Sequence, residues 1–194
     1  MLRSNNVIFY NRKIYINMKR MTLLFAAIAI SSIAAMAQGK TLVAYFSATG
    51  NTQRVAKQVA TITGGELYEI TPAEEYTSAD LDWHDNKSRS SVEMNDKSAR
   101  PAIIADLENA NSYDTIFIGY PIWWNEAPRI INTFIEKYSF AGKRVIPFAT
   151  SGGSSISNSA TQLRRSYPDI DWGEALLLNR ATNDDIKNWI KRQH

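Results

Sequence analysis

The 194-residue sequence contains no cysteine and only two histidines, His84 and His194. The lack of cysteine excludes disulfide bonds, thiolate catalysis, iron–sulfur clusters and the cysteine-dependent phosphatases, which also hold phosphate in a small-residue loop. His194 ends the chain, and a single histidine in a polar loop, such as His84, is more often solvated than a metal ligand. We therefore predict no metal site and no catalytic side chain.

A strong excess of charge is also missing from the body of the chain. The formal net charge is +3, but residues 1–37 carry five basic residues and no acidic one. The remainder therefore has 17 basic and 19 acidic residues. Because this balance is mildly acidic, the sequence predicts no nucleic-acid binding.

Two common nucleotide-binding motifs are absent as well. Gly39-Lys40-Thr41 resembles the end of a P-loop, but Ala34 stands where that motif needs glycine. No G-x-G-x-x-G occurs, so any NAD(P)H would dock transiently rather than in a built-in dinucleotide fold. The lack of a G-x-S-x-G elbow also excludes a serine hydrolase of that type.

Residues 18–37 have the pattern of a signal peptide. Lys19 and Arg20 precede the apolar run 22–36, and an A-x-A cleavage box ends at Ala37. The run is shorter than the roughly 20 residues that a membrane span needs. We predict cleavage after Ala37 and export to the periplasm or the exterior, with no stable membrane span; an uncleaved anchor is the alternative.

The chain is therefore predicted to have two parts. Residues 1–37 comprise an N-terminal extension and the signal peptide, within which residues 1–17 lie upstream of a second methionine, Met18. Residues 38–194 suit a single domain with one substantial core.

Strand-like apolar runs alternate with helical patterns from residue 40 onward, which implies a doubly wound α/β fold around a parallel sheet. Segment 71–101 is too long for a structureless connection, so we expect short helices or a flap there. Pro147 falls inside a predicted strand, where its missing N–H is costly. The predicted strands are 41–46, 66–70, 114–120, 143–150 and 174–178, and the predicted helices are 53–63, 101–110, 128–138, 157–166 and 183–192.

The loop after the first predicted strand has the composition of a phosphate-binding loop. Residues 47–52 read S-A-T-G-N-T and lead into a predicted helix. Phosphate at a helix N-terminus needs unpaired backbone N–H groups, hydroxyl donors and a close approach of the backbone, which Gly50 permits. The loop contains no lysine or arginine, which favours a monophosphate held by N–H dipoles.

Two further loops follow predicted strands. Residues 119–128 read G-Y-P-I-W-W-N-E-A-P, and residues 148–154 read F-A-T-S-G-G-S. Trp123 and Trp124 offer aromatic surface for a flat ring, and we expect one indole to contact that ring and the other to pack inward.

Together, the three loops resemble those of the flavodoxin family over about residues 40–190, in particular its branch with G-Y-P-I-W-W and T-S-G-G-S motifs. The resemblance implies a three-layer fold with strand order 2-1-3-4-5, FMN as cofactor and binding at the carboxyl ends of strands 1, 3 and 4. It places the phosphate on Ser47, Thr49, Gly50, Asn51 and Thr52. It places the flavin ring between two sets of residues: Pro121, Ile122, Trp123, Trp124 and Asn125, and Thr150, Ser151, Gly152, Gly153 and Ser154.

The resemblance further implies an oxidoreductase or an electron carrier. The partners would be NAD(P)H, a quinone or a redox protein. The mildly acidic balance differs from that of strongly acidic electron carriers. Trp83, beside His84, is a candidate to cover the flavin from segment 71–101. A non-redox module that binds another phosphorylated ligand is the alternative.

Overall fold

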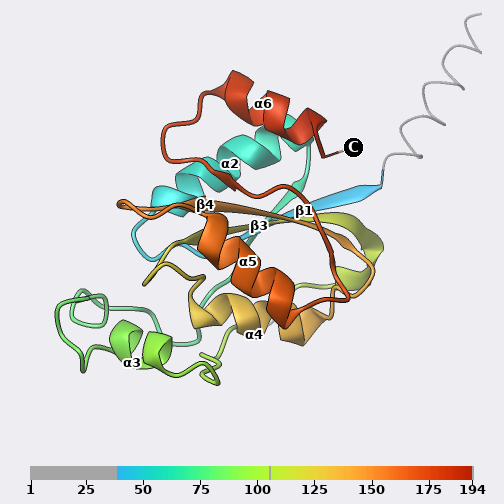
Figure 1. Cartoon of the computed structure of the whole chain (residues 1–194). Coiled ribbons are helices and arrows are strands. Elements are labelled where there is room, and N and C mark those ends of the chain that lie inside the picture. The colour runs from blue at the N-terminus through green and yellow to red at the C-terminus, as the bar shows by residue number, and fades with distance from the viewer. Residues whose placement is uncertain (1–38, 105, 194) are drawn as a thin grey trace, which may run out of the picture. The chain divides into compact units, whose positions relative to one another are not determined.

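A parallel sheet with the order β2-β1-β3-β4-β5 organises this computed structural model (Figure 1). Because every pairing in the sheet is parallel, the predicted doubly wound fold with order 2-1-3-4-5 is confirmed. The strands are β1 (Lys40–Tyr45), β2 (Glu66–Glu69), β3 (Tyr113–Pro121), β4 (Arg144–Thr150), β5 (Asp171–Trp172) and β6 (Leu176–Leu177), which pairs with β4.

The structure describes residues 39–104 and 106–193. The predicted signal peptide, its cleavage site after Ala37 and the first residue of the predicted domain, Gln38, lie outside these ranges. Within them, no helix is long and apolar enough to cross a bilayer.

Helices cover both faces of the sheet (Figure 1). Val43 and Tyr45 of β1 pack in one apolar cluster with α2 (Asn51–Thr63) and α6 (Asn183–Lys191). Leu42 and Ala44 pack in another with α4 (Arg129–Tyr138) and α5 (Ser157–Ser166). Because successive side chains of a strand point to opposite faces, a continuous apolar run fills both cores. The four helices predicted near these positions are confirmed.

Pro147 lies inside β4. Its backbone nitrogen, which carries no hydrogen, faces the gap between β5 and β6. The carbonyl of Val145 accepts a hydrogen bond from Gly173 N at 2.8 Å, on the β5 side. Backbone polar groups alternate sides along a strand, so Pro147 faces the same side, opposite residues 173–175 between β5 and β6. The fifth strand predicted at 174–178 is confirmed at β6, but its predicted length is wrong and β5 was not predicted, because the pairing breaks where β4 offers no donor.

The connection from β2 to β3 contains the α-helix α3 (Arg89–Asn95) and a series of turns. Arg129, only 7% exposed, ties this segment to α4: its guanidinium donates to the carbonyl oxygens of Met94 at 2.8 Å and Asp96 at 3.2 Å. Of the alternatives expected for segment 71–101, short helices or a flap, the structure shows the short helix α3.

The helix predicted at 101–110 is wrong. Ile103 instead forms an isolated antiparallel bridge with Pro72, and residues 101–104 and 106–109 contain no helix. A 3₁₀ turn, η1 (Ala110–Ser112), follows after Asn109 adopts a left-handed conformation with φ of 53°. Pairing with a distant part of the chain thus overrides the local signal of Pro101 at a helix start.

Candidate functional site

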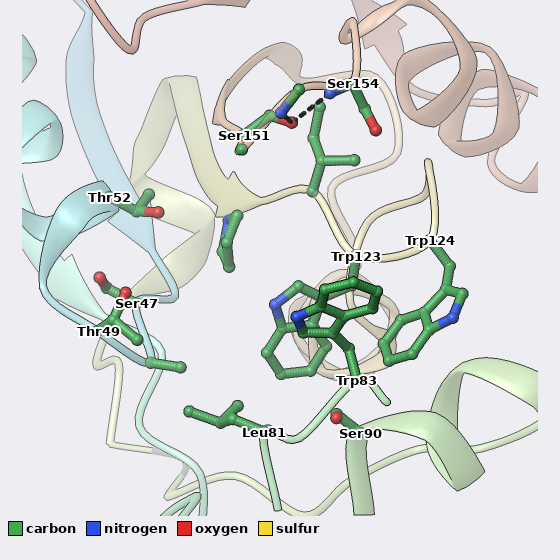
Figure 2. Close-up of a pocket in the computed structure, with 15 residues that line it drawn as sticks. Ser47, Thr49, Thr52, Leu81, Trp83, Ser90, Trp123, Trp124, Ser151 and Ser154 are labelled. Carbon is green, nitrogen blue, oxygen red and sulfur yellow. Dashed lines mark hydrogen bonds between the residues drawn. The ribbon is translucent and has the colours of Figure 1, made fainter. Parts of the chain in front are cut away.

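A cavity of about 550 Å³ lies at the carboxyl ends of β1, β3 and β4 (Figure 2). An adjoining cavity of about 360 Å³ is lined by Asn51 and Thr150, whereas Gly50 and Asn125 line neither cavity. The larger cavity brings together the other predicted site residues, Ser47, Thr49, Thr52, Pro121, Ile122, Trp123, Trp124, Ser151, Gly152, Gly153 and Ser154. Their role in binding a cofactor stays a prediction.

The loop from β1 into α2 presents a row of unused backbone donors. Gly50 precedes α2 with φ of 81°, a left-handed conformation that glycine adopts without strain. Among the described residues, no hydrogen bond uses the backbone N–H groups of residues 47–53, and the first one used is Arg54 N, 3.1 Å from Gly50 O. The first turn of α2 has no acidic residue, so the positive end of the helix dipole is unopposed. This arrangement favours an anion.

The threonine hydroxyls of the loop have different environments. Thr49 is exposed and accepts a hydrogen bond from Asn51 Nδ2 at 3.2 Å. Thr52 is 1% exposed, and its Oγ1 lies 2.8 Å from Oγ1 of Thr150, which is 6% exposed. Because this bond uses only one of the two hydroxyl protons, the pair keeps a second proton to donate.

The two tryptophans are held by a tight turn at the end of β3. Trp123 and Glu126 exchange backbone hydrogen bonds of 3.0 and 2.9 Å. Trp124 and Asn125 between them have φ of 44° and 67°, the left-handed pair that a two-residue hairpin turn requires. Positive φ is uncommon outside glycine, and Asn158 Nδ2 supports the turn by donating to the carbonyl of Asn125 at 2.9 Å.

The two indoles lie differently although both line the cavity. Trp123 packs edge-on against Phe46 and Tyr76, with ring centroids 5.6 and 5.4 Å apart. Trp124 is 45% exposed. Trp123 therefore belongs to the aromatic core, and Trp124 is the indole presented from the rim (Figure 2).

The loop after β4 is held by its own serine and by a residue that sequence reasoning missed. Ser151 Oγ accepts hydrogen bonds from the backbone N–H groups of Gly153 at 3.1 Å and Ser154 at 2.7 Å (Figure 2). Asn179 accepts from Ser151 N at 2.7 Å and donates to the carbonyl of the same residue. Asn179 gives no local signal, because it follows β6 and reaches the loop only through the folded sheet.

Arg54 is a second residue that the sequence did not single out. It lies on the second turn of α2, is exposed, and lines the adjoining cavity with Thr49 and Asn51. Because Arg54 lies in the helix and not in the six-residue loop, the loop motif did not reveal that a positive charge lies close to the predicted phosphate site.

Segment 71–101 contributes Leu81, Trp83 and Ser90 to the larger cavity (Figure 2). Trp83 is 66% exposed, and its ring centroid lies 3.5 Å from that of His84, which is also exposed. In the part of the chain that the structure describes, no group of three or more histidine, aspartate or glutamate side chains could hold a metal.

Tyr76 anchors this segment and packs against Trp123, which lines the cavity. Its hydroxyl donates to Glu93 Oε2 at 2.5 Å, and the guanidinium of Arg89 lies 4.1 Å from its ring centre. Burial, and then the hydrogen bond to Glu93, raise the pKa of Tyr76 far above its usual range. The hydroxyl therefore stays protonated at neutral pH and acts as a structural donor.

Comparison with known proteins identifies related chains. The family model described as flavodoxin matches residues 40–193. A crystal structure from Bacteroides eggerthii, of a protein classed as a flavoprotein by inference, is 60% identical with a TM-score of 0.79, over 80% of this chain and 98% of the other. A similarly classed protein from Bacteroides uniformis is 63% identical with a TM-score of 0.76, over 79% and 98%.

A more distant structure shares the fold. It is a flavoprotein from Lactobacillus acidophilus, solved in complex with FMN, 22% identical with a TM-score of 0.64 over 79% of this chain and 99% of the other. A search of the curated proteins returned no match.

Proposed function

This chain belongs to the flavodoxin family, and from that premise we propose that it binds FMN and passes electrons between a donor and an acceptor. The observation that carries the proposal is the row of unused N–H groups at residues 47–53, at the N-terminus of α2. A phosphate monoester there would receive several backbone hydrogen bonds and the field of the helix dipole.

The residues around the cavity fit the rest of FMN. Trp124 offers an exposed indole face, and Ile122 is a half-buried apolar neighbour at the same cavity. The N–H groups of Gly153 and Ser154 are held in place by Ser151. Bound FMN would supply the reversible uptake of one or two electrons. The protein's part is to bind the phosphate, orient the ring and exclude water.

The relative that was solved with FMN supports the same cofactor, although at 22% identity its likeness to this chain establishes the fold alone. The unpaired loop donors and the aromatic cavity of this chain are therefore the main support for FMN.

A fluorescence titration tests the cofactor. Purified protein is titrated into FMN, with riboflavin, which lacks the phosphate, as control. Tight binding of FMN with much weaker binding of riboflavin is expected. Binding of neither would contradict the proposal and favour a non-redox module for another phosphorylated ligand.

We also propose that the redox role is that of an oxidoreductase acting on NAD(P)H, a quinone or a similar small molecule, or else that of an electron carrier. Steady-state oxidation of NADH or NADPH by FMN-loaded protein would favour the enzyme. Photoreduction that stops at a stable one-electron stage, without turnover, would favour the carrier.

Export is proposed from the sequence of residues 18–37 alone. Sequencing of the N-terminus of protein recovered outside the cytoplasm should begin at Gln38. Recovery of cytosolic protein that retains residues 18–37 would contradict export, without bearing on FMN.

A further inference from the structure

A separate cavity of about 660 Å³ lies beside the 550 Å³ cavity predicted to hold the flavin, and the two share the loop 151–154. The 550 Å³ cavity is called the first cavity below and the 660 Å³ cavity the second. The other lining residues of the second cavity come from β6, from α6, from the connection between them and from Arg192, which directly follows α6. The predicted cofactor-binding residues include only the shared loop, so this cavity is not explained by the proposed function.

The second cavity is lined by two guanidinium groups, Arg180 and Arg192, and by the carboxylate of Asp185, and one of the guanidinium groups has no ion-pair partner among the described residues. Arg192 pairs with Glu174 at 3.2 Å, and the carboxylate of Asp185 accepts two hydrogen bonds from Thr182 in the cap of α6. Arg180 is exposed and takes part in none of the ion pairs of the described residues. A guanidinium in this setting is suited to an anion and matches phosphate geometry well.

The remaining lining is mixed. Leu176, Leu177 and Ala181 provide half-buried apolar surface, and Asn188 provides an exposed amide. A ligand with a phosphate and a flat, partly apolar group matches this combination, as a nucleotide does.

The loop shared by the two cavities has no side chains at its middle. Gly152 and Gly153 form the middle of the shared loop, and a Cβ atom added at either residue would meet nothing within 4 Å. A ligand with two parts can therefore place one part beside Arg180 and extend the other across the glycines toward Trp124.

We propose that the second cavity binds the adenosine diphosphate half of a nicotinamide dinucleotide, whose nicotinamide end reaches the first cavity over Gly152 and Gly153. The inference rests on the proposed function, because a flavoprotein needs an electron donor and this class joins an adenosine diphosphate half to a redox-active nicotinamide ring. The chain has no G-x-G-x-x-G motif, so a dinucleotide would need a binding site of another kind, and the second cavity would provide one.

Calorimetric titration of the FMN-loaded full chain with NADP⁺, NAD⁺ and ADP tests the site without reducing the flavin. Arg180→Gln should weaken binding of at least one dinucleotide about tenfold, the scale of one lost charge-assisted hydrogen bond. Arg165→Gln is the matched control, since Arg165 is exposed in the last turn of α5 and lines neither cavity. It should bind like the unmodified protein.

Gly153→Val tests the path between the cavities. The side chain would stand on the shared loop, so it should weaken binding of the dinucleotide more than that of ADP, which needs only the second cavity. Equal weakening of both would contradict the two-cavity arrangement. The absorbance of bound FMN is measured in each preparation before titration.

The outcomes separate this inference from the proposed function. FMN-loaded protein that binds no dinucleotide, or that binds it equally well with Arg180→Gln, overturns the inference and leaves the FMN proposal standing. Equal weakening by Arg165→Gln also overturns it, because the effect would then be that of overall charge. Failure to load FMN contradicts the proposed function; ADP titration of that apoprotein, with and without Arg180→Gln, still tests the second cavity.

Discussion

The hydroxyl oxygens of Thr52 and Thr150 lie 2.8 Å apart and join the first turn of α2 to the end of β4. Both side chains are almost fully buried, and they come from two of the three loops predicted to hold the cofactor. A direct hydrogen bond thus connects the phosphate loop to the loop after β4.

Removal of the Thr52 hydroxyl is therefore expected to affect both stability and binding. Thr52→Val leaves the Thr150 hydroxyl buried without its partner, which should lower the free energy of unfolding by about 1–3 kcal/mol. Chemical denaturation of the apoprotein measures this loss. Thr49→Ala, at an exposed position, should leave stability nearly unchanged while weakening FMN binding. Equal stability of Thr52→Val and unmodified protein would contradict the structural role of the pair.

Arg54 is expected to contribute to FMN affinity through charge. Arg54→Gln should weaken FMN binding by up to about 1 kcal/mol, because the side chain is exposed and screened by salt. Riboflavin binding should not change. Lys57→Gln, one turn further along α2 and outside both site cavities, is the control. Titrations at low and high salt measure the effect, and equal losses for FMN and riboflavin would exclude a contact with the phosphate.

The two tryptophans should respond differently to truncation. Trp123→Ala removes the indole that packs against Phe46 and Tyr76 and should lower the free energy of unfolding by about 3 kcal/mol. Trp124→Ala should change stability little, since the side chain is 45% exposed, but should weaken FMN binding. Thermal unfolding and FMN titration of both variants provide the comparison. Unchanged FMN affinity in Trp124→Ala would exclude that indole from the flavin site.

Gly119 is expected to tolerate no side chain. A Cβ atom there would lie 2.2 Å from Cζ of Phe148, its neighbour in β4. Gly119→Ala should therefore destabilise the fold by at least about 1–3 kcal/mol, measured by chemical denaturation. Gly152→Ala, where a Cβ atom meets open space, is the control, and Phe148→Leu should recover part of the loss in Gly119→Ala. An unfolding midpoint like that of Gly152→Ala would show that Phe148 can move aside.

Stability should depend on pH through a network of Arg100, Glu136 and Tyr167. Two hydrogen bonds from Arg100, 2.7 and 2.8 Å long, are the main cause that lowers the pKa of Glu136 below its usual 4.5, and Tyr167 donates a further one at 2.7 Å. A lowered pKa means that this stabilisation is present above pH 4.5 and is lost as the pH falls through the folded-state value.

The same network predicts a loss of stability at alkaline pH as well, caused by deprotonation of Tyr167. Burial is the main cause that raises the pKa of Tyr167 from 10 to about 12, so its contribution is present below pH 10 and is lost as the pH rises toward 12. Urea unfolding as a function of pH measures both effects. The stability difference between unmodified protein and Glu136→Gln should shrink below pH 4.5, and a constant difference would contradict the lowered pKa of Glu136.

The elements that sequence patterns predicted well are those with strong local signals. The apolar run of β1 and the helical spacing of α2, between Gly50 and Gly64, require no knowledge of distant residues. The predicted helix at 101–110 failed because Ile103 pairs with Pro72, a contact about 30 residues away that competes with a weak local preference. Only the folded chain brings such partners together.

The predicted site shows the same division. Three loops could be recognised because each carries its own motif directly after a strand, and parallel strands bring their carboxyl ends to one edge. Asn179 and Arg54 carry no motif. Asn179 matters because it is hydrogen-bonded to Ser151, and Arg54 matters because it lines the adjoining cavity. A linear pattern contains neither relationship.

By itself, the sequence determined the alternation of strands and helices and the chemistry of the three loops, because apolar periodicity and backbone freedom act over a few residues. The tertiary structure decided which donors stay unpaired, which tryptophan is exposed and where the fifth strand breaks. These properties depend on packing and hydrogen bonding between residues far apart in the chain. Pro147 illustrates the difference: its missing N–H is a local fact, but its consequence appears only opposite the gap between β5 and β6.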